Sequence, residues 1–285
     1  MGITGPAPFS FERQWFSRAI RVIQSQPGVF ERSVREEAQR KLGLGSRQVL
    51  AIEYWLRVSG ITESVGGETR LTAFGKAISD FDPRLEERET WYALHHYLAS
   101  ARNNASTYWL AFRRLPDTFS RQDLDYGLRM EFPGLSDRTY SDAATVFFSI
   151  CTKTEISTLC RLVRVDQHNI EKVQDPPLPL GLVAFALTHW VERTDVLTAH
   201  FSDLLGPDGP LRPFGVSPEA LVNYLENIQE RYDRRVTTHS QTAGLNSVAF
   251  ARTLPSVSIL RAAYREKLHR MDPLTALERE LEGTR

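Results

Sequence analysis

Residues 30–77 place the strongest constraint on how this chain can fold, because short glycine breaks divide them into successive elements. The segment 32–42 is polar with helical spacing, and Gly43-Leu44-Gly45 ends it. The segment 46–58 opens with Ser46, a residue type that caps helices by accepting a backbone N–H bond. Two helices joined by a tight glycine turn are therefore expected here.

A β-hairpin is expected directly after the second helix. Gly60 lets the chain turn out of that helix. Two short extended runs follow at 61–65 and 69–72, and Gly66-Gly67 joins them, which is typical of a two-residue hairpin loop. The order helix, turn, helix and hairpin predicts a winged helix-turn-helix.

The second helix has an apolar face and an opposite face that is free to bind. Val49, Ile52, Trp55 and Leu56 share the apolar face at 3.6 residues per turn, so we expect them to pack on neighbouring helices. In a helix-turn-helix the opposite face enters the major groove of DNA. The expected DNA-binding residues of the unit are Arg47, Gln48, Leu50, Tyr54, Arg57, Arg70, Arg35 and Arg40.

The residue types suggest separate roles on DNA. Arg47 can donate two bonds to a guanine edge or bind a phosphate, and Leu50 can touch a thymine methyl group. Tyr54 and Arg57 are expected to hold the DNA backbone, and Arg70 is expected to reach a phosphate from the tip of the wing. Winged helices also serve purely as protein-contact domains, so an ordinary solvated helix face is the alternative interpretation.

Charge, cysteines and hydropathy restrict the class of protein. The 285 residues suffice for one large or two modest domains, and the 35 basic residues equal the 35 acidic ones. Zero net charge argues against DNA binding that rests only on an overall excess of positive charge. Cys151 and Cys160 are nine apart, which fits neither a zinc-ligand pair nor a redox motif, so buried free thiols are expected. No membrane span or secretion signal is evident, so we expect a cytoplasmic protein.

The remainder of the chain is expected to be helical. The predicted fold is mainly α, with a winged helix-turn-helix domain at 1–80 and a helical domain at 81–285. The proline-rich run 175–180 is the segment that most resembles a linker, and it suggests that the helical domain is subdivided there. A helix pair is expected at 181–205, and the charged end of the chain is expected to fray.

Motifs of enzymes are missing from the sequence. It has no phosphate-binding GxxxxGK[ST] loop, no GxGxxG, no GxSxG and no HExxH, and no carboxylate stands two residues before a lysine. Adjacent histidines such as His95 and His96 diverge by about 100° on a helix, so packing is expected rather than metal binding. Asp175-Pro-Pro-Leu178 resembles the catalytic loop of DNA-amino methyltransferases, but Leu178 cannot stack on a flipped base. We therefore expect no catalytic residues, no metal and no cofactor.

Several motifs, in order, resemble one known family. They are LGLGSRQVLAIEYWL, LTAFGK and DPRLEERETWYALHHYLAS, with Thr242-Ala243-Gly244-Leu245 near the end of the chain. The series is similar to bacterial proteins known as the domain of unknown function 4007 family, from about Phe11 to Tyr264. The resemblance implies an association with bacterial DNA-modification and phage-defence gene clusters, including phosphorothioation-type systems.

The sequence departs from that family's pattern at two positions. Ser46 stands where the family tends to be basic, although Arg47 follows it, and Glu53 stands at another position that tends to be basic. An acid on this helix would repel phosphate, so the departure predicts weak DNA binding.

The leading hypothesis is a non-enzymatic accessory protein that binds double-stranded DNA in a modification or restriction system, with protein partners in a defence complex. The first alternative is a protein-interaction scaffold that docks on a modification enzyme or ATPase. The second is a transcriptional regulator of the defence operon, which would act as a homodimer on a palindrome.

Overall fold

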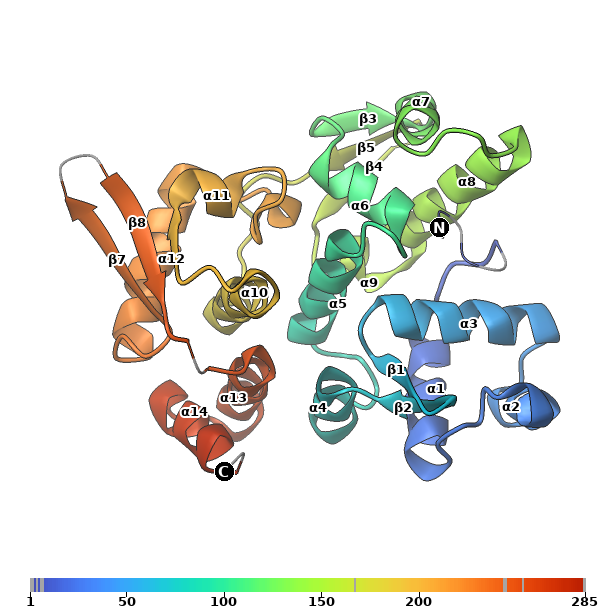
Figure 1. Cartoon of the computed structure of the whole chain (residues 1–285), viewed down its shortest axis with the longest axis horizontal. Coiled ribbons are helices and arrows are strands. Elements are labelled where there is room, and N and C mark those ends of the chain that lie inside the picture. The colour runs from blue at the N-terminus through green and yellow to red at the C-terminus, as the bar shows by residue number, and fades with distance from the viewer. Residues whose placement is uncertain are drawn as a thin grey trace. The chain divides into compact units, whose positions relative to one another are not determined.

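The structure of the chain is a computed structural model that describes residues 3, 5, 8–166, 168–242, 245–252 and 254–283 (Figure 1). It is mainly helical, as predicted, with three small antiparallel sheets. Internal contacts divide the chain into two units, Met1–Val173 and Gln174–Arg285, and each is described by itself. The division lies beside the proline-rich run at 175–180.

The first unit starts with a helix, a helical pair and a hairpin. Its elements in order are α1 (Arg13–Ser25), the 3-10 turn η1 (Arg32–Val34), α2 (Arg35–Leu42), α3 (Ser46–Val58), β1 (Thr62–Val65), β2 (Glu68–Leu71) and α4 (Ala73–Phe81). The predicted order of helix, turn, helix and hairpin is therefore present.

The turn between α2 and α3 is built on glycine. Gly43 ends α2 in a left-handed conformation with φ of 66°. Residues with a Cβ atom adopt this conformation only at a cost in conformational energy, so glycine is favoured here. The predicted cap was wrong by one position, because Gly45 and not Ser46 occupies the N-cap of α3. The side-chain oxygen of Gln48 accepts the Gly45 N–H at 2.9 Å, which is the half of a capping box that needs no serine hydroxyl.

The β1–β2 hairpin forms because its loop consists of two glycines. Val65 lies opposite Glu68 in the antiparallel register, and Gly66 and Gly67 have φ of 62° and 91°. Two consecutive positive φ angles match the twist of a tight hairpin, and glycine adopts them without strain. β2 packs on α1 and α4, and β1 packs on α3, so the hairpin is held at its base.

The core beneath these elements is aliphatic and aromatic. Its fully buried members on α1, α3 and α4 are Phe16, Ile20, Ile23, Val49, Ile52, Leu56, Phe74 and Ile78. The face of α3 that was predicted to be apolar is therefore the buried face.

The remainder of the first unit is helical with one sheet. It comprises α5 (Arg88–Ser100), α6 (Ser106–Arg113), β3 (Thr118–Ser120), α7 (Arg121–Glu131), α8 (Asp137–Lys153), α9 (Glu155–Thr158), β4 (Val163–Val165) and β5 (Asn169–Lys172). The sheet has the order β3-β5-β4. Lys172 at the end of β5 is buried and donates to the carbonyls of Ala111 at 3.2 Å and Leu115 at 2.7 Å, which ties the sheet to α6.

The second unit packs helices around a twisted three-stranded sheet. It contains α10 (Leu180–Thr194), β6 (Thr198–His200), α11 (Phe201–Leu205), the 3-10 turn η2 (Arg212–Phe214), α12 (Pro218–Arg231), β7 (Thr237–Thr242), β8 (Leu245–Phe250), α13 (Ser256–His269) and α14 (Pro273–Glu282). The strand order is β6-β8-β7. α10 is buried along most of its length and packs on α13.

Three expectations for the chain beyond the first hairpin need correction or limitation. The sheet around β5 was not predicted, because its strands of three or four residues carry too little alternation to stand out. The sheet around β8 was not predicted either, because β7 reads TTHSQT and contains no alternating apolar residues. The predicted helix pair at 181–205 is present as α10 and α11, with the unpredicted short strand β6 between them. The predicted turn at 242–245 joins β7 to β8, and its central residues, Ala243 and Gly244, lie outside the described residues.

The predicted frayed tail is also wrong, because α14 forms there. The carboxylate of Glu280 is buried and accepts bonds from Arg261, at 2.6 Å, and from Arg265 on α13. A charged sequence predicts a solvated end, but here the charges pair across two helices. No helix in the described ranges is long and apolar enough to cross a membrane.

Candidate nucleic-acid interface

α3 presents a short basic face to solvent. Arg47 and Arg57 are exposed, as predicted, and Leu50 is half-buried between them. Gln48 is also half-buried, and its amide oxygen is occupied by the Gly45 N–H, so its first role is to hold the turn. The exposed guanidinium groups at the two ends of α3 are therefore its best candidates for binding an anionic ligand.

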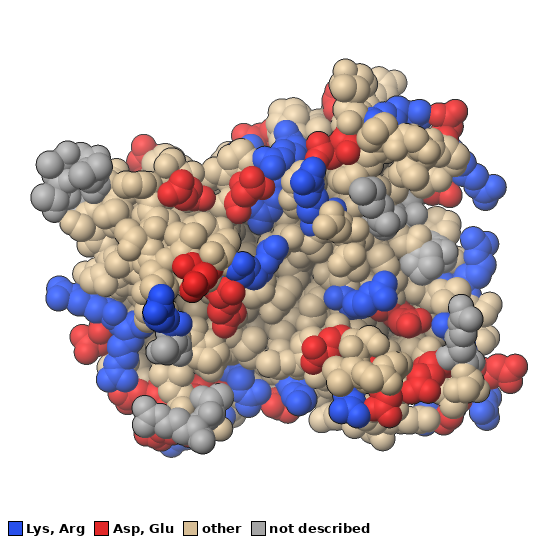
Figure 2. Space-filling view, in the orientation of Figure 1, with Lys and Arg blue, Asp and Glu red and all other residues tan. Residues whose placement is uncertain are grey.

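The charges around this face are mixed. Figure 2 shows that Lys and Arg side chains on this side of the first unit alternate with Asp and Glu and do not form one unbroken band. On α2, Arg40 is exposed while Arg35 lies 3.7 Å from the carboxylate of Glu53. A few separate cations, and not a broad positive surface, are available to an anionic partner.

Tyr54 does not belong to the exposed face, and its predicted outward position is wrong. Its side chain is 6% exposed, its hydroxyl donates to the carbonyl of Asn104, and its ring lies edge-on to Trp55 at 5.0 Å. Burial raises the pKa of this phenol above its usual range. Gly5 lies against the ring, so segments remote in sequence cover a side of α3 that helical periodicity alone assigned to solvent.

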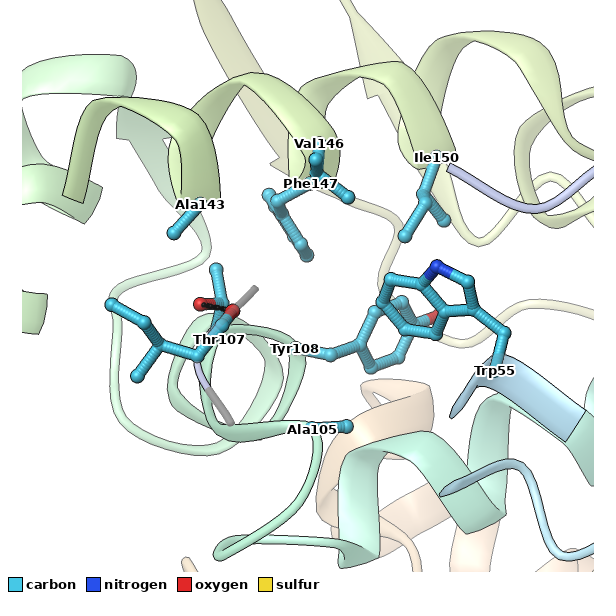
Figure 3. Close-up of a pocket in the computed structure, with 9 residues that line it drawn as sticks. Trp55, Ala105, Thr107, Tyr108, Ala143, Val146, Phe147 and Ile150 are labelled. Carbon is cyan, nitrogen blue, oxygen red and sulfur yellow. Dashed lines mark hydrogen bonds between the residues drawn. The ribbon is translucent and has the colours of Figure 1, made fainter. Parts of the chain in front are cut away.

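Trp55 packs α3 against α6 and α8. The indole N–H donates to the carbonyl of Phe9 at 2.7 Å. Figure 3 shows the indole beside Tyr108 of α6 and below Phe147 and Ile150 of α8, around a gap of about 10 Å³. A gap of that size holds one water molecule at most, so α3 is tightly anchored and its exposed side chains project from a fixed base.

An acid lies between the cations of the interface. Glu53 lines a hollow of about 100 Å³ with Arg57 and with Ser64 and Thr69 of the hairpin. Burial raises the pKa of the Glu53 carboxyl, and Arg35 and Arg57 oppose that rise. The carboxylate offsets part of the positive charge that an anion approaching α3 would meet.

The hairpin contributes a cation and two hydroxyl groups. Arg70 is exposed, and its guanidinium donates to the carboxylate of Glu68 at 2.6 and 3.0 Å. Ser64 and Thr69 are opposite each other in the register, and sequence reasoning missed them, although the alternation of the strands places both on one face. Nothing lies within 4 Å of a Cβ built on Gly66 or Gly67, so the tip is open to a ligand.

Groups for covalent or metal chemistry are not gathered in the described part of the chain. No cluster of three or more His, Cys, Asp or Glu side chains occurs among the described residues. Cys151 and Cys160 are free and buried, as predicted, and burial raises the pKa of both thiols, which makes them poor nucleophiles. His95 is buried and its Nδ1 lies 2.7 Å from the hydroxyl of Tyr108, so the packing role predicted for it is confirmed.

A known family matches part of this chain, and known structures share its fold. Residues 7–146 match the model of a family described as a protein of unknown function, DUF4007. A solved structure described as magnesium ion-bound SspB superimposes with a TM-score of 0.77 at 20% identity, and the match covers 97% of this chain and 95% of that one. Another SspB crystal structure gives a TM-score of 0.74 at 19% identity with the same coverage. No curated protein sequence matches significantly.

Proposed function

We propose that residues 30–77 act as a winged helix-turn-helix that binds double-stranded DNA. They lie within residues 7–146, the part of the chain that matches the model of the DUF4007 family. α3 is the recognition helix and the β1–β2 hairpin is the wing. The observation that carries the proposal is the anchored α3 with Arg47 and Arg57 exposed beside an open hairpin tip. The resemblance to defence-associated proteins supports a role as accessory protein of a bacterial DNA-modification or restriction system.

The proposed contact set is smaller than the set predicted from the sequence. Arg47, Leu50 and Arg57 contact the major groove and its flanking phosphates, and Arg70 contacts a phosphate from the wing. Arg40 is available as a further backbone contact, and Arg35 is partly neutralised by Glu53. Tyr54 is left out because it is buried.

Affinity for DNA follows from the number of free cations. With only a few phosphates neutralised, binding on the order of micromolar at physiological salt is expected, and it falls steeply as salt rises because counterions are released. An arginine forked onto a base contributes about 1–3 kcal/mol, whereas one on a phosphate weakens binding to all sequences equally when it is removed.

Fluorescence anisotropy with a labelled duplex at two salt concentrations tests the proposal. Arg47→Ala is expected to weaken binding, and Glu53→Gln is expected to strengthen it by removing a negative charge. Arg138→Ala is the matched control, because that side chain on α8 is 89% exposed. Unchanged affinity in both α3 variants, or no saturable binding by the wild type at low salt, would show that α3 does not bind DNA.

A protein-interaction scaffold is the second candidate function, and one observation favours it. Tyr126 and Met130 are one helical turn apart on α7, and each is 67% exposed. Exposed apolar side chains that lie side by side can form part of an apolar patch, and large apolar patches mark contacts with protein partners. A transcriptional regulator would instead be dimeric, so the mass of the protein in solution, measured by light scattering, separates that alternative from the other two.

We further propose that the protein has no catalytic activity of its own, because the sequence lacks the motifs of hydrolases, nucleases and methyltransferases. A structural neighbour is described as magnesium ion-bound, but no three carboxylate, histidine or cysteine ligands come together among the described residues of this chain. Supercoiled plasmid incubated with the protein and Mg²⁺ should stay intact. Relaxation or cleavage that a point substitution in this chain abolishes would overturn this proposal.

A further inference from the structure

Four arginines line one hollow on the outer side of α1. The hollow has a volume of about 270 Å³ and is lined by Arg13, Arg18, Arg21 and Arg84 together with Ser17 and Glu86. None of its lining residues lies on α3 or on the hairpin, so the hollow is separate from the interface described above.

Helical spacing places three of these arginines on one face. At 100° per residue, Arg13, Arg21 and Arg18 span an arc of about 140° that begins next to Ile20 and runs away from the buried Phe16. Like charges three and four residues apart on a helix destabilise it. Repulsion among the cations on this face therefore lowers the stability of α1, and no acidic side chain within α1 compensates for it.

The fourth arginine comes from a loop with a fixed conformation. The carboxylate of Asp82 accepts the backbone N–H groups of Glu86 at 2.8 Å and Glu87 at 3.0 Å. Leu85, between Arg84 and Glu86, is fully buried with φ of 53°, a conformation that leucine adopts only when its surroundings impose it. The loop is thus rigid where it presents the Arg84 side chain.

A hydrogen bond joins the loop to the helix. The hydroxyl of Ser17, itself buried, donates to the carbonyl of Pro83 at 2.7 Å. A guanidinium nitrogen of Arg18 donates to the carbonyl of Leu42, which fixes that side chain as well. The two walls of the hollow are therefore held in place without a ligand, as expected of a site arranged in advance for binding.

The positive charges in the hollow are largely uncompensated. Arg13 lies 3.3 Å from Glu155 and is the one partly neutralised member. Within the described ranges, Arg18, Arg21 and Arg84 form no ion pair within 4 Å, and Glu86 is the single acid that lines the hollow. Arg18, Arg21 and Arg84 thus line one hollow without ion-pair partners among the described residues, and such guanidinium groups suit phosphate because each can donate two parallel hydrogen bonds to its oxygens.

We propose that this hollow is a second anion site of the protein and binds a phosphate group at the end of a DNA strand or on a free nucleotide. Its volume is just below the range of about 300–1,000 Å³ that holds drug-sized ligands, so it accommodates a phosphate and part of a sugar, with the base outside. The site does not depend on DNA binding by α3.

Binding of single-stranded oligonucleotides with a 5′-phosphate or a 5′-hydroxyl tests the proposal with the full chain. The double variant Arg21→Gln/Arg84→Gln is used because neither side chain is tied to another element by a side-chain hydrogen bond among the described residues. Arg138→Gln on α8 is the matched control. Circular dichroism melting checks that each variant is folded, and Arg47→Ala separates this site from α3.

The wild type is expected to bind the 5′-phosphorylated strand at least fivefold more tightly than the 5′-hydroxyl strand. The double variant should lose that preference, while Arg138→Gln and Arg47→Ala keep it, and this result identifies a strand end as the ligand. If the two strands bind equally but dAMP and inorganic phosphate bind the wild type and not the double variant, the ligand is a free nucleotide. If the double variant binds all four probes as the wild type does, the hollow is not a phosphate site.

Discussion

Replacement of Tyr54 by phenylalanine separates the two roles that this residue has been given. Tyr54→Phe keeps the ring that packs on Trp55 and removes only the hydroxyl that donates to the carbonyl of Asn104. The structure places this hydroxyl in the protein interior, so the variant should lose stability and keep its affinity for DNA. A groove-facing tyrosine would give the opposite result.

The magnitude follows from one buried hydrogen bond. Its net contribution is about 0.5–1.5 kcal/mol, and an acceptor left without its donor adds to the loss, so we expect a total of about 1–2 kcal/mol. For a unit of this size, each kcal/mol lowers the melting temperature by about 2–4 °C. The expected decrease is therefore about 2–8 °C.

Thermal melting followed by circular dichroism, together with anisotropy on a labelled duplex, measures both effects. Arg57→Ala is the counterpart variant, because it lies on the same helix but is exposed, and it should weaken DNA binding without lowering the melting temperature. Lower DNA affinity for Tyr54→Phe at an unchanged melting temperature would refute our assignment of the faces of α3.

Three further changes test other contacts. A Cβ on Gly75 would lie 2.1 Å from the carbonyl oxygen of Ile61, so Gly75→Ala should cost on the order of 3 kcal/mol in urea unfolding. Burial, aided by a neighbouring arginine, lowers the pKa of His189 from 6.5 to about 4. Since the unfolded chain then binds more protons between those values, stability should fall by about 2 kcal/mol from pH 7 to 4.5, and less in His189→Leu. Glu280→Ala leaves two arginines of α13 without their shared partner, so it should cost about 2 kcal/mol and expose α14 to limited proteolysis.

The local elements of residues 30–77 were predictable because their signals are local. A glycine pair between two extended runs specifies a hairpin with little help from the rest of the chain, and Val49, Ile52 and Leu56 reveal the buried face by spacing alone. The resemblance to the family was also recognisable from short motifs in order, and the family model matches residues 7–146. DNA binding by this unit stays a prediction.

The misplaced residues depend on contacts between distant parts of the chain. Tyr54 is covered by residues near positions 5 and 104, and the sequence of α3 does not predict either contact. The arginine hollow needs Arg84, brought to α1 by a loop whose conformation is set by Asp82. Periodicity reports which face of a helix is apolar, but not which remote segment covers its border.

The position of β5 in its sheet has a consequence for synthesis of the chain and for work with fragments. β5 is the central strand and the last one made, so β3 and β4 have no partner until the ribosome has released residue 172. A fragment cut at the family boundary, residue 146, would end inside α8 and lack both β4 and β5. Such a fragment would leave β3 with an open edge, which favours aggregation. A fragment that ends at Val173 keeps the sheet whole and is the shortest one that we expect to remain monodisperse.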